Sequence, residues 1–523
     1  MHKSRFIWLL FTAALAAGCH RASSRPLEVG MWYWNSPFVV TDADLRSLKT
    51  IGVKTLYVRE ATFTTDGKSA LTEFHEHWQS NPPGIKIVLV YNFDGGMIRH
   101  FGTLPNNSLV RDIAAGIGHT VDVVKSHGIN PAGIQMDLDC PTRLLGKYAE
   151  LLVALRTRLI ADKTLADGQS FSATALQTWL GSDRYADLAR ASDFLAPQFY
   201  ESRTGATIDT VAPIADLASL TRRVEKADAN GRPFMVGLAT YGHALLYDSK
   251  GNFAGMYHGM KPTDALRHPA LRYDASVPMS DSGTAPSIAQ YAGENVLKLT
   301  AVQSDLHGHG FGYHIAYIIP SPEMLERQIA AVAKARAEHC AGIILYRFPQ
   351  SGDELSIPLD AVADTFAGRA ARLGVRVQLT RRTVPWALIG ASGAGTKSPA
   401  SFEVSACNTG TAPTLLAPDG LTVVVRLDSP GIERVDRGSF DEASVGILSQ
   451  DGRFQKCAYA HADAVLLRKY QLLPRERIVS GGIEATVDDA QDASAEWRSR
   501  FDGGFSSLEG AERTMRARSE RGG

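Results

Sequence analysis

Residues 132–141 read AGIQMDLDCP, an apolar strand that ends in two acidic residues. Apolar Met136 and Leu138 alternate with Asp137 and Asp139, so both carboxylates project from the same side of the strand. Two carboxylates this close cannot both ionise freely. One of them is expected to have a raised pKa, as a general acid needs at neutral pH. The alternative is that the pair binds an arginine or backbone amides in a loop network.

Seven further apolar segments flank this strand along the chain. Several are near-continuous runs of apolar and β-branched residues, as expected of parallel strands buried on both faces. Amphipathic helical stretches separate them, for example residues 144–159 and 321–338. We therefore predict an α/β fold, a (β/α)8 barrel over residues 28–368, with an open doubly wound sheet as the alternative. The eight expected strands are residues 29–34, 55–60, 85–91, 133–139, 170–176, 193–200, 233–242 and 342–348.

Three other segments differ from the barrel in composition. Residues 243–320 are rich in Gly, His and Tyr and form a long insertion between the seventh and eighth strands. Insertions of this length are usually functional or form small subdomains. Residues 374–488 contain short alternating strands separated by Gly, Pro and Asp, which predicts a β-sandwich. Residues 489–523 are polar, and we expect a frayed tail there.

The N-terminus predicts export. A basic start precedes an apolar run over residues 6–17 that is too short to span a bilayer. The run ends in LAAGC, with Cys19 where a bacterial lipoprotein is lipidated. We predict a signal peptide over residues 1–18, a tether over residues 19–27, and a lipid-anchored protein of the bacterial cell envelope. A plain secretory signal is the alternative.

Composition narrows the range of partners. The chain has 523 residues, with 55 basic and 55 acidic side chains, and no basic run interleaved with aromatics, so a nucleic-acid partner is not expected. The only expected membrane contact is the lipid anchor, and no cofactor is expected. Cys407 and Cys457 could form a disulfide in an oxidising compartment. The loop HGHGFGYH holds His307, His309 and His314 without a clear carboxylate partner, so we expect a surface or rim loop and no metal.

The order of motifs along the barrel resembles the family-18 glycoside hydrolases. That family carries a strand motif Asp-Gly-x-Asp-x-Asp-Trp-Glu, often followed by Tyr-Pro. Gly133, Asp137 and Pro141 keep its glycine, its last aspartate and the following proline, and Asp139 falls at the catalytic glutamic acid. The sixth and seventh strands of the family and its inserted subdomain also have counterparts here, in QFYE (198–201), VGLATYGHA (236–244) and the long insertion.

The chain departs from this pattern at three positions. Ala132 and Gln135 replace the first two aspartates of the motif, and Asp139 is one methylene shorter than glutamate. A misplacement of about 1 Å can cost about a hundredfold in rate. The chain also resembles an uncharacterised bacterial family of predicted lipoproteins (domain of unknown function 3142), which shares the Asp-x-Asp variant and the sandwich domain.

The family-18 resemblance implies catalytic roles for three residues. Asp139 would be the general acid, Asp137 would orient the substrate's acetamido group as the nucleophile, and Tyr200 would hydrogen-bond the same group. This substrate-assisted route is an exception to the two-carboxylate scheme. The alternative is a carboxylate pair from different strands, in which Glu60 or Glu201 serves as nucleophile or base with Asp139.

Substrate binding is expected from side chains at the strand ends. Aromatic rings with a few polar groups are typical of sugar sites, because apolar sugar faces stack on rings. The expected substrate-binding residues are Trp34, Glu60, Gln135, Trp179, Gln198, Glu201, Tyr241 and Tyr346.

These observations predict an exported glycoside hydrolase that acts on a β-linked glycan, N-acetylated or not. The alternative is a non-catalytic carbohydrate-binding or cell-envelope scaffold lipoprotein, since chitinase-like lectins on this fold have typically lost the catalytic glutamate. A barrel of unrelated chemistry is the third reading, because fold alone does not fix function.

Overall fold

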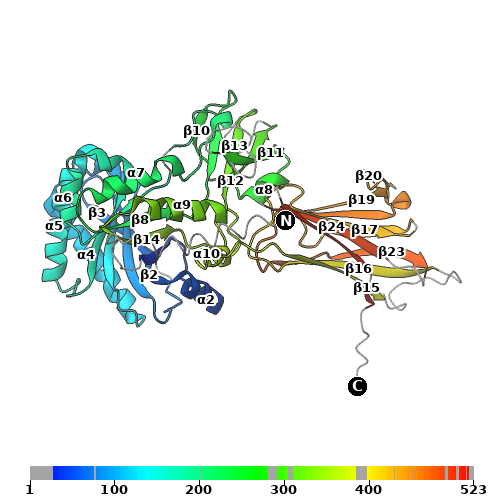
Figure 1. The fold of residues 1–523 in the computed structure, drawn as a ribbon, viewed down its shortest axis with the longest axis horizontal. Helices are drawn as coiled ribbons and strands as arrows, with labels where there is room; N and C mark the ends of the chain where they lie inside the picture. Colours follow the sequence, from blue (N-terminus) through cyan, green and yellow to red (C-terminus); the bar gives the residue numbers. More distant parts are fainter. Residues whose placement is uncertain are drawn as a thin grey trace, which may run out of the picture.

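The structure is a computed structural model of an α/β barrel, interrupted before its last strand by an inserted sheet and followed by a β-sandwich (Figure 1). It describes residues 27–75, 78–201, 203–280, 291–303, 310–383, 397–428, 430–449, 451–488, 493–501, 504, 506–513 and 515–516. Cys19, the predicted lipidation site, lies outside these residues, as do His307 and His309. Within the described residues, no helix is long and apolar enough to cross a membrane.

Eight parallel strands close into a barrel, which confirms the predicted fold class. Neighbouring strands pair in the order β1-β2-β4-β5-β6-β7-β8-β14, and β14 pairs with β1 to close the ring. The strands are β1 (Glu28–Tyr33), β2 (Val53–Thr65), β4 (Lys86–Phe93), β5 (Gly133–Asp137), β6 (Ser170–Leu176), β7 (Leu195–Gln198), β8 (Phe234–Ala239) and β14 (Cys340–Tyr346).

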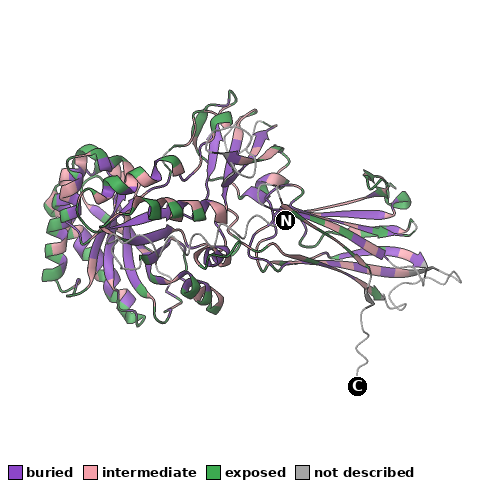
Figure 2. Ribbon diagram, in the orientation of Figure 1, coloured by how far each residue is buried: buried purple, intermediate pink, exposed green. Residues whose placement is uncertain are grey.

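Side chains alternate between two separate cores. Inward-facing residues such as Trp32, Tyr57 and Met235 fill the barrel interior. The intervening residues pack outward against the helices, for example Leu56 and Val58 of β2. This alternation explains why the strands read as continuous apolar runs, and Figure 2 shows the strands buried and the helices exposed on their outer faces.

Helices follow most of the barrel strands. They are α2 (Asp42–Ile51), α3 (Gly95–His100), α4 (Asn106–Ser126), α5 (Leu145–Ala161), α6 (Tyr185–Arg190), α7 (Leu217–Asp228), α9 (Pro322–Ala335) and α10 (Leu359–Phe366), with short 3-10 helices η1 (Thr142–Leu144), η2 (Gln177–Gly181) and η3 (Ile208–Thr210). The chain between β2 and β4 differs from a regular barrel, because its described residues form β3 (Ala70–Phe74), antiparallel to β2. Helix α4 packs against β3, and a side chain added at Gly116 would collide with Thr72.

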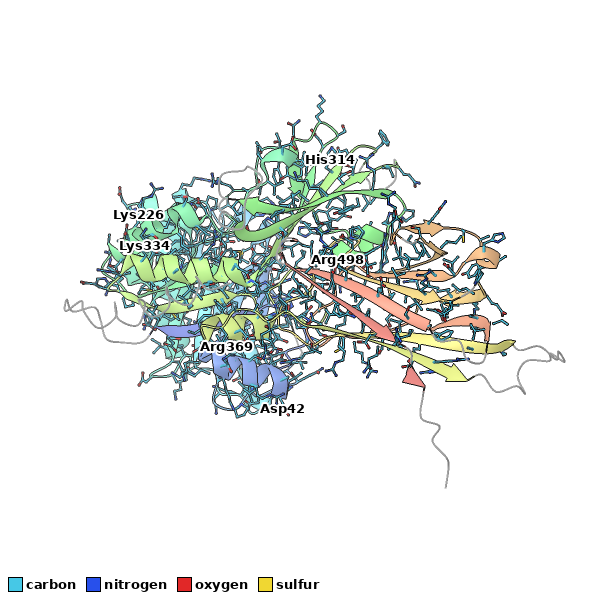
Figure 3. The ribbon with its side chains drawn as sticks, turned by 45° about the vertical axis from the view of Figure 1, so that its right-hand side comes forward. Asp42, Lys226, His314, Lys334, Arg369 and Arg498 are labelled. Carbon is cyan, nitrogen blue, oxygen red and sulfur yellow. The ribbon has the colours of Figure 1, made fainter. Side chains whose placement is uncertain are left out.

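The long insertion forms a five-stranded antiparallel sheet with one short helix. Its strand order is β10-β9-β13-β12-β11. The elements are β9 (Ala244–Tyr247), β10 (Phe253–Met256), α8 (Pro262–Arg267), β11 (Leu271–Ser280), β12 (Tyr291–Ala301) and β13 (His314–Pro320). Figure 3 places His314 on this sheet, apart from the outer helices α7 and α9 that carry Lys226 and Lys334. His314 Nδ1 lies 2.8 Å from Thr300 Oγ1, and the described residues contain no cluster of three or more metal-ligating side chains.

The C-terminal part is a sandwich of two antiparallel-rich sheets. One has the order β18-β23-β16-β15-β26, with β22 also on β16, and the other β20-β19-β21-β17-β24-β25. The strands are β15 (Val375–Thr383), β16 (Lys397–Asn408), β17 (Leu421–Leu427), β18 (Ile432–Asp436), β19 (Glu442–Leu448), β20 (Phe454–Lys456), β21 (Ala464–Lys469), β22 (Arg477–Val479), β23 (Gly482–Asp488), β24 (Ala493–Phe501), β25 (Ser506–Arg513) and β26 (Met515–Arg516), and η6 (Tyr459–His461) follows β20.

Two expectations about this region were wrong. The predicted polar tail contains β24 and β25, which extend the second sheet, because small buried residues such as Ala493 and Ala495 alternate with the charged ones. The predicted Cys407–Cys457 disulfide is absent, and both thiols are free. Cys407 lies in β16 of one sheet, whereas Cys457 follows β20 of the other.

Candidate active site

The carboxylates singled out in the sequence lie at the C-terminal end of the barrel. Asp137 is the last residue of β5, and Asp139 follows two residues later. Glu201 follows β7 and has a φ of 55°, in the left-handed region that costs roughly 1–2 kcal/mol for a residue other than glycine. Strained residues of this kind cluster at functional sites. In parallel barrels this end of the strands carries the active site.

Asp137 is anchored by two neighbouring strands. Thr174 Oγ1 of β6 donates to Asp137 Oδ1 at 2.5 Å, and Gln198 Nε2 of β7 donates to the same oxygen at 3.3 Å. Burial raises the pKa of Asp137, and these two hydrogen bonds oppose the rise without cancelling it. Asp137 is therefore fixed in place as part of a carboxyl pair that retains protons to a higher pH than ordinary aspartates.

Asp139 is the strongest candidate for a general acid. Desolvation, then the negative charges of Asp137 and Glu201, raise the pKa of Asp139 to about 7. The side chain is exposed to solvent, although the walls of the barrel mouth surround it. The two neighbouring carboxylates raise the pKa whatever the solvent contact, so its direction does not depend on burial alone. A large fraction of Asp139 is consequently protonated near neutral pH.

Glu201 is held in the opposite protonation state. Tyr241 Oη donates to Glu201 Oε1, and His243 Nδ1 lies 3.3 Å from the same oxygen. Desolvation favours the protonated form of Glu201, but the hydrogen bonds and the charge of His243 outweigh it and lower the pKa. The mouth therefore combines an acid that keeps its proton with a carboxylate that has lost it, which is how acid and base roles are separated in many enzymes.

A cluster of aromatic rings lies beside the carboxylates. Tyr346, the last residue of β14, stacks on Tyr200 with ring centroids 5.6 Å apart and an interplanar angle of 12°. Tyr241 meets Tyr346 edge-on at 5.0 Å, and Trp34 does so at 5.7 Å. Trp34 and Tyr346 are half-buried, whereas Tyr200 and Tyr241 are nearly covered. Only the first two rings offer a substantial accessible face to a ligand.

Three of the residues predicted to bind substrate lie elsewhere. Trp179 is completely buried in η2, where its Nε1 donates to the Cys140 carbonyl at 3.2 Å and steadies the chain after Asp139. Glu60 is also buried, at a bulge within β2 and not at its end, and accepts a hydrogen bond from Trp78 Nε1 at 2.9 Å. These positions contradict the expectation that Trp179 and Glu60 lie on the rim.

Gln135 lies below the carboxylates in the barrel interior. It is fully buried, its Oε1 accepts from Trp32 Nε1 at 2.7 Å, and its Nε2 donates to Ser172 Oγ at 3.3 Å. Both ends of the amide are satisfied by protein. Gln135 therefore supports the floor of the site and does not present a group to substrate, contrary to the prediction.

The sequence analysis missed three residues of the mouth. Thr174 hydrogen-bonds Asp137, and His243 lies against Glu201. Arg59 of β2 places its guanidinium carbon 5.5 Å from the Trp34 ring centroid. Thr174 lies at an inward-facing position near the end of β6, and Arg59 at an inward-facing position within β2, a signal that the alternation of side chains could have revealed. His243 lies beyond the end of β8, and no spacing rule would have selected it.

Several solved structures are similar to this chain at low sequence identity. A chitinase from Chromobacterium violaceum is 15% identical, with a TM-score of 0.41 over 66% of this chain and 100% of that one. A glycoside hydrolase family 18 N-acetylglucosaminidase from Paenibacillus barengoltzii is 13% identical, with a TM-score of 0.40 over 65% and 100%. The spore cortex-lytic enzyme SleL from Bacillus cereus is 13% identical, with a TM-score of 0.39 over 67% and 76%.

Sequence comparison adds one family. No curated protein shows significant similarity to the chain. Residues 96–265, which run from α3 through β5 and β7 into the insertion, match the family described as "Domain of unknown function (DUF3142)".

Proposed function

We propose that this protein is an exported, lipid-anchored glycoside hydrolase that cleaves a β-linked glycan with Asp139 as general acid. The observation that carries the proposal is the separation of protonation states in one barrel mouth. The pKa of Asp139 is raised to about 7, while that of Glu201 is lowered. Glycoside hydrolysis requires one carboxylic acid to protonate the leaving oxygen and a negative or nucleophilic group near the anomeric carbon.

Asp139 would donate its proton to the glycosidic oxygen as the bond to the anomeric carbon breaks. The motif resemblance supports this role, since Asp139 falls at the position of the family-18 acid. Its solvent exposure leaves the carboxyl group accessible to a bound sugar. A group that titrates near the working pH is the most effective general acid, because a large fraction of it is protonated and its proton is readily transferred.

Two groups are candidates for stabilising the anomeric carbon. In the substrate-assisted route, the substrate's acetamido oxygen attacks and Asp137, fixed by Thr174 and Gln198, orients the acetamido group. In the two-carboxylate route, ionised Glu201 serves as nucleophile or base. The two routes differ in one requirement, because only the first needs an N-acetyl group on the sugar that is cleaved.

The half-buried rings of Trp34 and Tyr346 would provide the stacking surface for the sugar. Gln198 and Glu201, both at the mouth, would supply polar contacts. Tyr200 is nearly covered and packed against Tyr346, so in this proposal its main contribution is to orient that ring.

A release assay tests the proposal. A soluble form without Cys19, residues 20–523, would be incubated with chitin, peptidoglycan and other bacterial and plant glycans beside the Asp139→Asn variant. Asp122→Asn, an exposed aspartate on α4, is the matched control. We expect turnover by the wild-type and control proteins and a loss of about 100-fold or more in Asp139→Asn. Binding without turnover in all three proteins would instead favour a non-catalytic carbohydrate-binding protein.

Lipid anchoring rests on the LAAGC segment that ends at Cys19. Metabolic labelling with a radioactive fatty acid in a bacterial host tests it. We expect label in the wild-type protein and none in Cys19→Ser, and equal labelling of the two would contradict the assignment.

A further inference from the structure

We infer that Arg59 forms an anion-binding subsite in the barrel mouth, and that the glycan bound there carries a carboxylate. This inference rests on the proposed function for its substrate, a glycan, but its evidence is independent of the catalytic carboxylates.

Arg59 lies inside the barrel. It follows Tyr57 by two positions in β2, and Tyr57 belongs to the interior core. The strand alternation therefore directs Arg59 to the same side, one layer closer to the mouth. Its contact with Trp34, whose ring packs edge-on against Tyr346, places the guanidinium beside the exposed stacking surface.

The guanidinium has no anionic partner among the described residues. Among the described residues, Arg59 contacts the face of Trp34 at 5.5 Å and is attracted at longer range by Glu73, and it forms no hydrogen bond or ion pair. Arg347, which follows β14 at the same end of the barrel, pairs with Asp353 at 3.0 Å. Arg59 is half-buried, and desolvation lowers its pKa, so this charge has lost water without gaining a hydrogen-bonding group in return.

Charge is divided across the mouth. Asp137 and Asp139 lie at the end of β5 and Glu201 follows β7, while Arg59 comes from β2, which is separated from β5 by β4 and from the Tyr346 strand β14 by β1. A glycan stacked on Trp34 and Tyr346 would meet the acid at one end and the guanidinium at the other. Guanidinium groups bind carboxylates through two parallel hydrogen bonds, and such a carboxylate would supply the missing partner.

Muramic-acid glycans and uronic-acid glycans both carry such a carboxylate, and the experiment separates them. Binding of each glycan to the Asp139→Asn protein would be measured by calorimetry, beside the same glycan with its carboxyl groups reduced to alcohols. Asp139→Asn is used because it retains the ligand without cleaving it. The binding readout is therefore separate from the failure or success of hydrolysis.

We expect at least one acidic glycan to bind more tightly than its reduced form. In an added Arg59→Met change, that preference should fall by about 10- to 100-fold, the range for a hydrogen bond to a charged group. Arg59→Lys should retain part of it, and salt should weaken binding of the acidic glycan only. Arg232→Met, an exposed arginine before β8 at the opposite end of the barrel, should change nothing.

Equal binding of the acidic and reduced glycans, an unchanged preference in Arg59→Met, or no measurable binding of either form would overturn the inference. Thermal unfolding of each variant shows whether it is folded, and Arg59→Lys serves if Arg59→Met is not. Hydrolysis of neutral and acidic glycans at equal rates would remove the inference and leave the proposed function intact. Arg59-dependent binding without hydrolysis by the wild-type protein would contradict the proposed hydrolase function and leave the Arg59 subsite intact.

Discussion

Replacing Asp137 with asparagine should lower the pH at which Asp139 loses its proton. The substitution keeps the shape of the side chain but removes a negative charge that raises the pKa of Asp139. In the wild-type protein Asp139 titrates at about 7. Desolvation, the largest cause, persists in the variant. The new midpoint should therefore lie between 7 and the value of about 3.9 for an ordinary aspartic acid.

The consequence at neutral pH follows from the protonated fraction. A group with a pKa of 7 is half protonated at pH 7, and a decrease of one pH unit in the midpoint leaves about one molecule in eleven protonated. Any step that needs the proton on Asp139 then slows about fivefold at pH 7 for the first unit of decrease.

Infrared difference spectroscopy of the carboxyl C=O band measures this midpoint without any need for turnover. Spectra of Asp137→Asn would be compared with those of the double variant that also carries Asp139→Asn, so that the band is assigned. Glu201→Gln is a second arm, and because Glu201 is the smaller of the two charge effects on Asp139, its midpoint should fall by less. A midpoint that stays at 7 or rises in Asp137→Asn would refute the electrostatic account of the site.

Three further predictions concern stability, binding and the inserted sheet. Because the pKa of Asp139 is raised in the folded protein, its proton stabilises the fold fully below about pH 4, and this contribution is lost as the pH rises through 7. The melting temperature of Asp139→Asn should therefore rise relative to that of the wild-type protein between pH 4 and 8. A constant difference between the two melting temperatures would contradict the raised pKa. Trp34→Ala should weaken glycan binding by about three- to tenfold, as expected for the loss of one stacked ring. Trp179→Phe should change thermal stability more than glycan affinity, as calorimetry of binding and unfolding would measure. A larger change in affinity than in stability would show that Trp179 contacts sugar. Arg267 Nη1 lies 2.6 Å from Oδ1 of the buried Asp441 and joins the inserted sheet to the sandwich. Arg267→Met should destabilise the protein by about 3–5 kcal/mol, because it removes a partner of a buried charge. A change below about 1 kcal/mol in denaturant unfolding would show that Lys469, whose Nζ lies 3.8 Å from Asp441 Oδ2, is a sufficient partner.

The barrel was predictable because its strands obey a simple rule. Segments buried on both faces must be apolar throughout, and each of the eight expected segments overlaps a barrel strand. The absence of a regular helix after the second strand was not predictable in the same way. Thr64 and Thr65 extend β2 beyond its pairing with β4, and only the tertiary pairing with β3 shows why.

The candidate site was predictable where its residues lie on strands and less so elsewhere. Asp137 and Asp139 could be placed from the period of a strand alone. Trp179 has the same composition signal as a sugar-binding tryptophan, but the 3-10 turn of η2 directs it into the core. His243 reaches Glu201 through the fold of the chain after β8, 42 positions later in the sequence, which no local pattern encodes.

In the sandwich, too, local composition did not predict every strand. Strand β24 reads ASAEWRSRF, with charged residues at every second position from Glu496 to Arg500, a composition that predicts a polar tail. Its inward face uses alanine, serine and phenylalanine, among them Ala495 and Ser499, which are fully buried. Small inward residues suffice because the facing sheet already supplies larger ones, such as Phe402 and Val404 of β16.

The role of Asp139 as general acid is best tested by comparing two leaving groups. Wild-type and Asp139→Asn proteins would be assayed on a glycan substrate and on the matching dinitrophenyl glycoside, whose leaving group departs without protonation. We expect a loss of about 100- to 10,000-fold in kcat/KM for Asp139→Asn on the glycan and a far smaller loss on the dinitrophenyl glycoside. Equal losses on both substrates, or no loss on either, would contradict the assignment of Asp139 as the general acid.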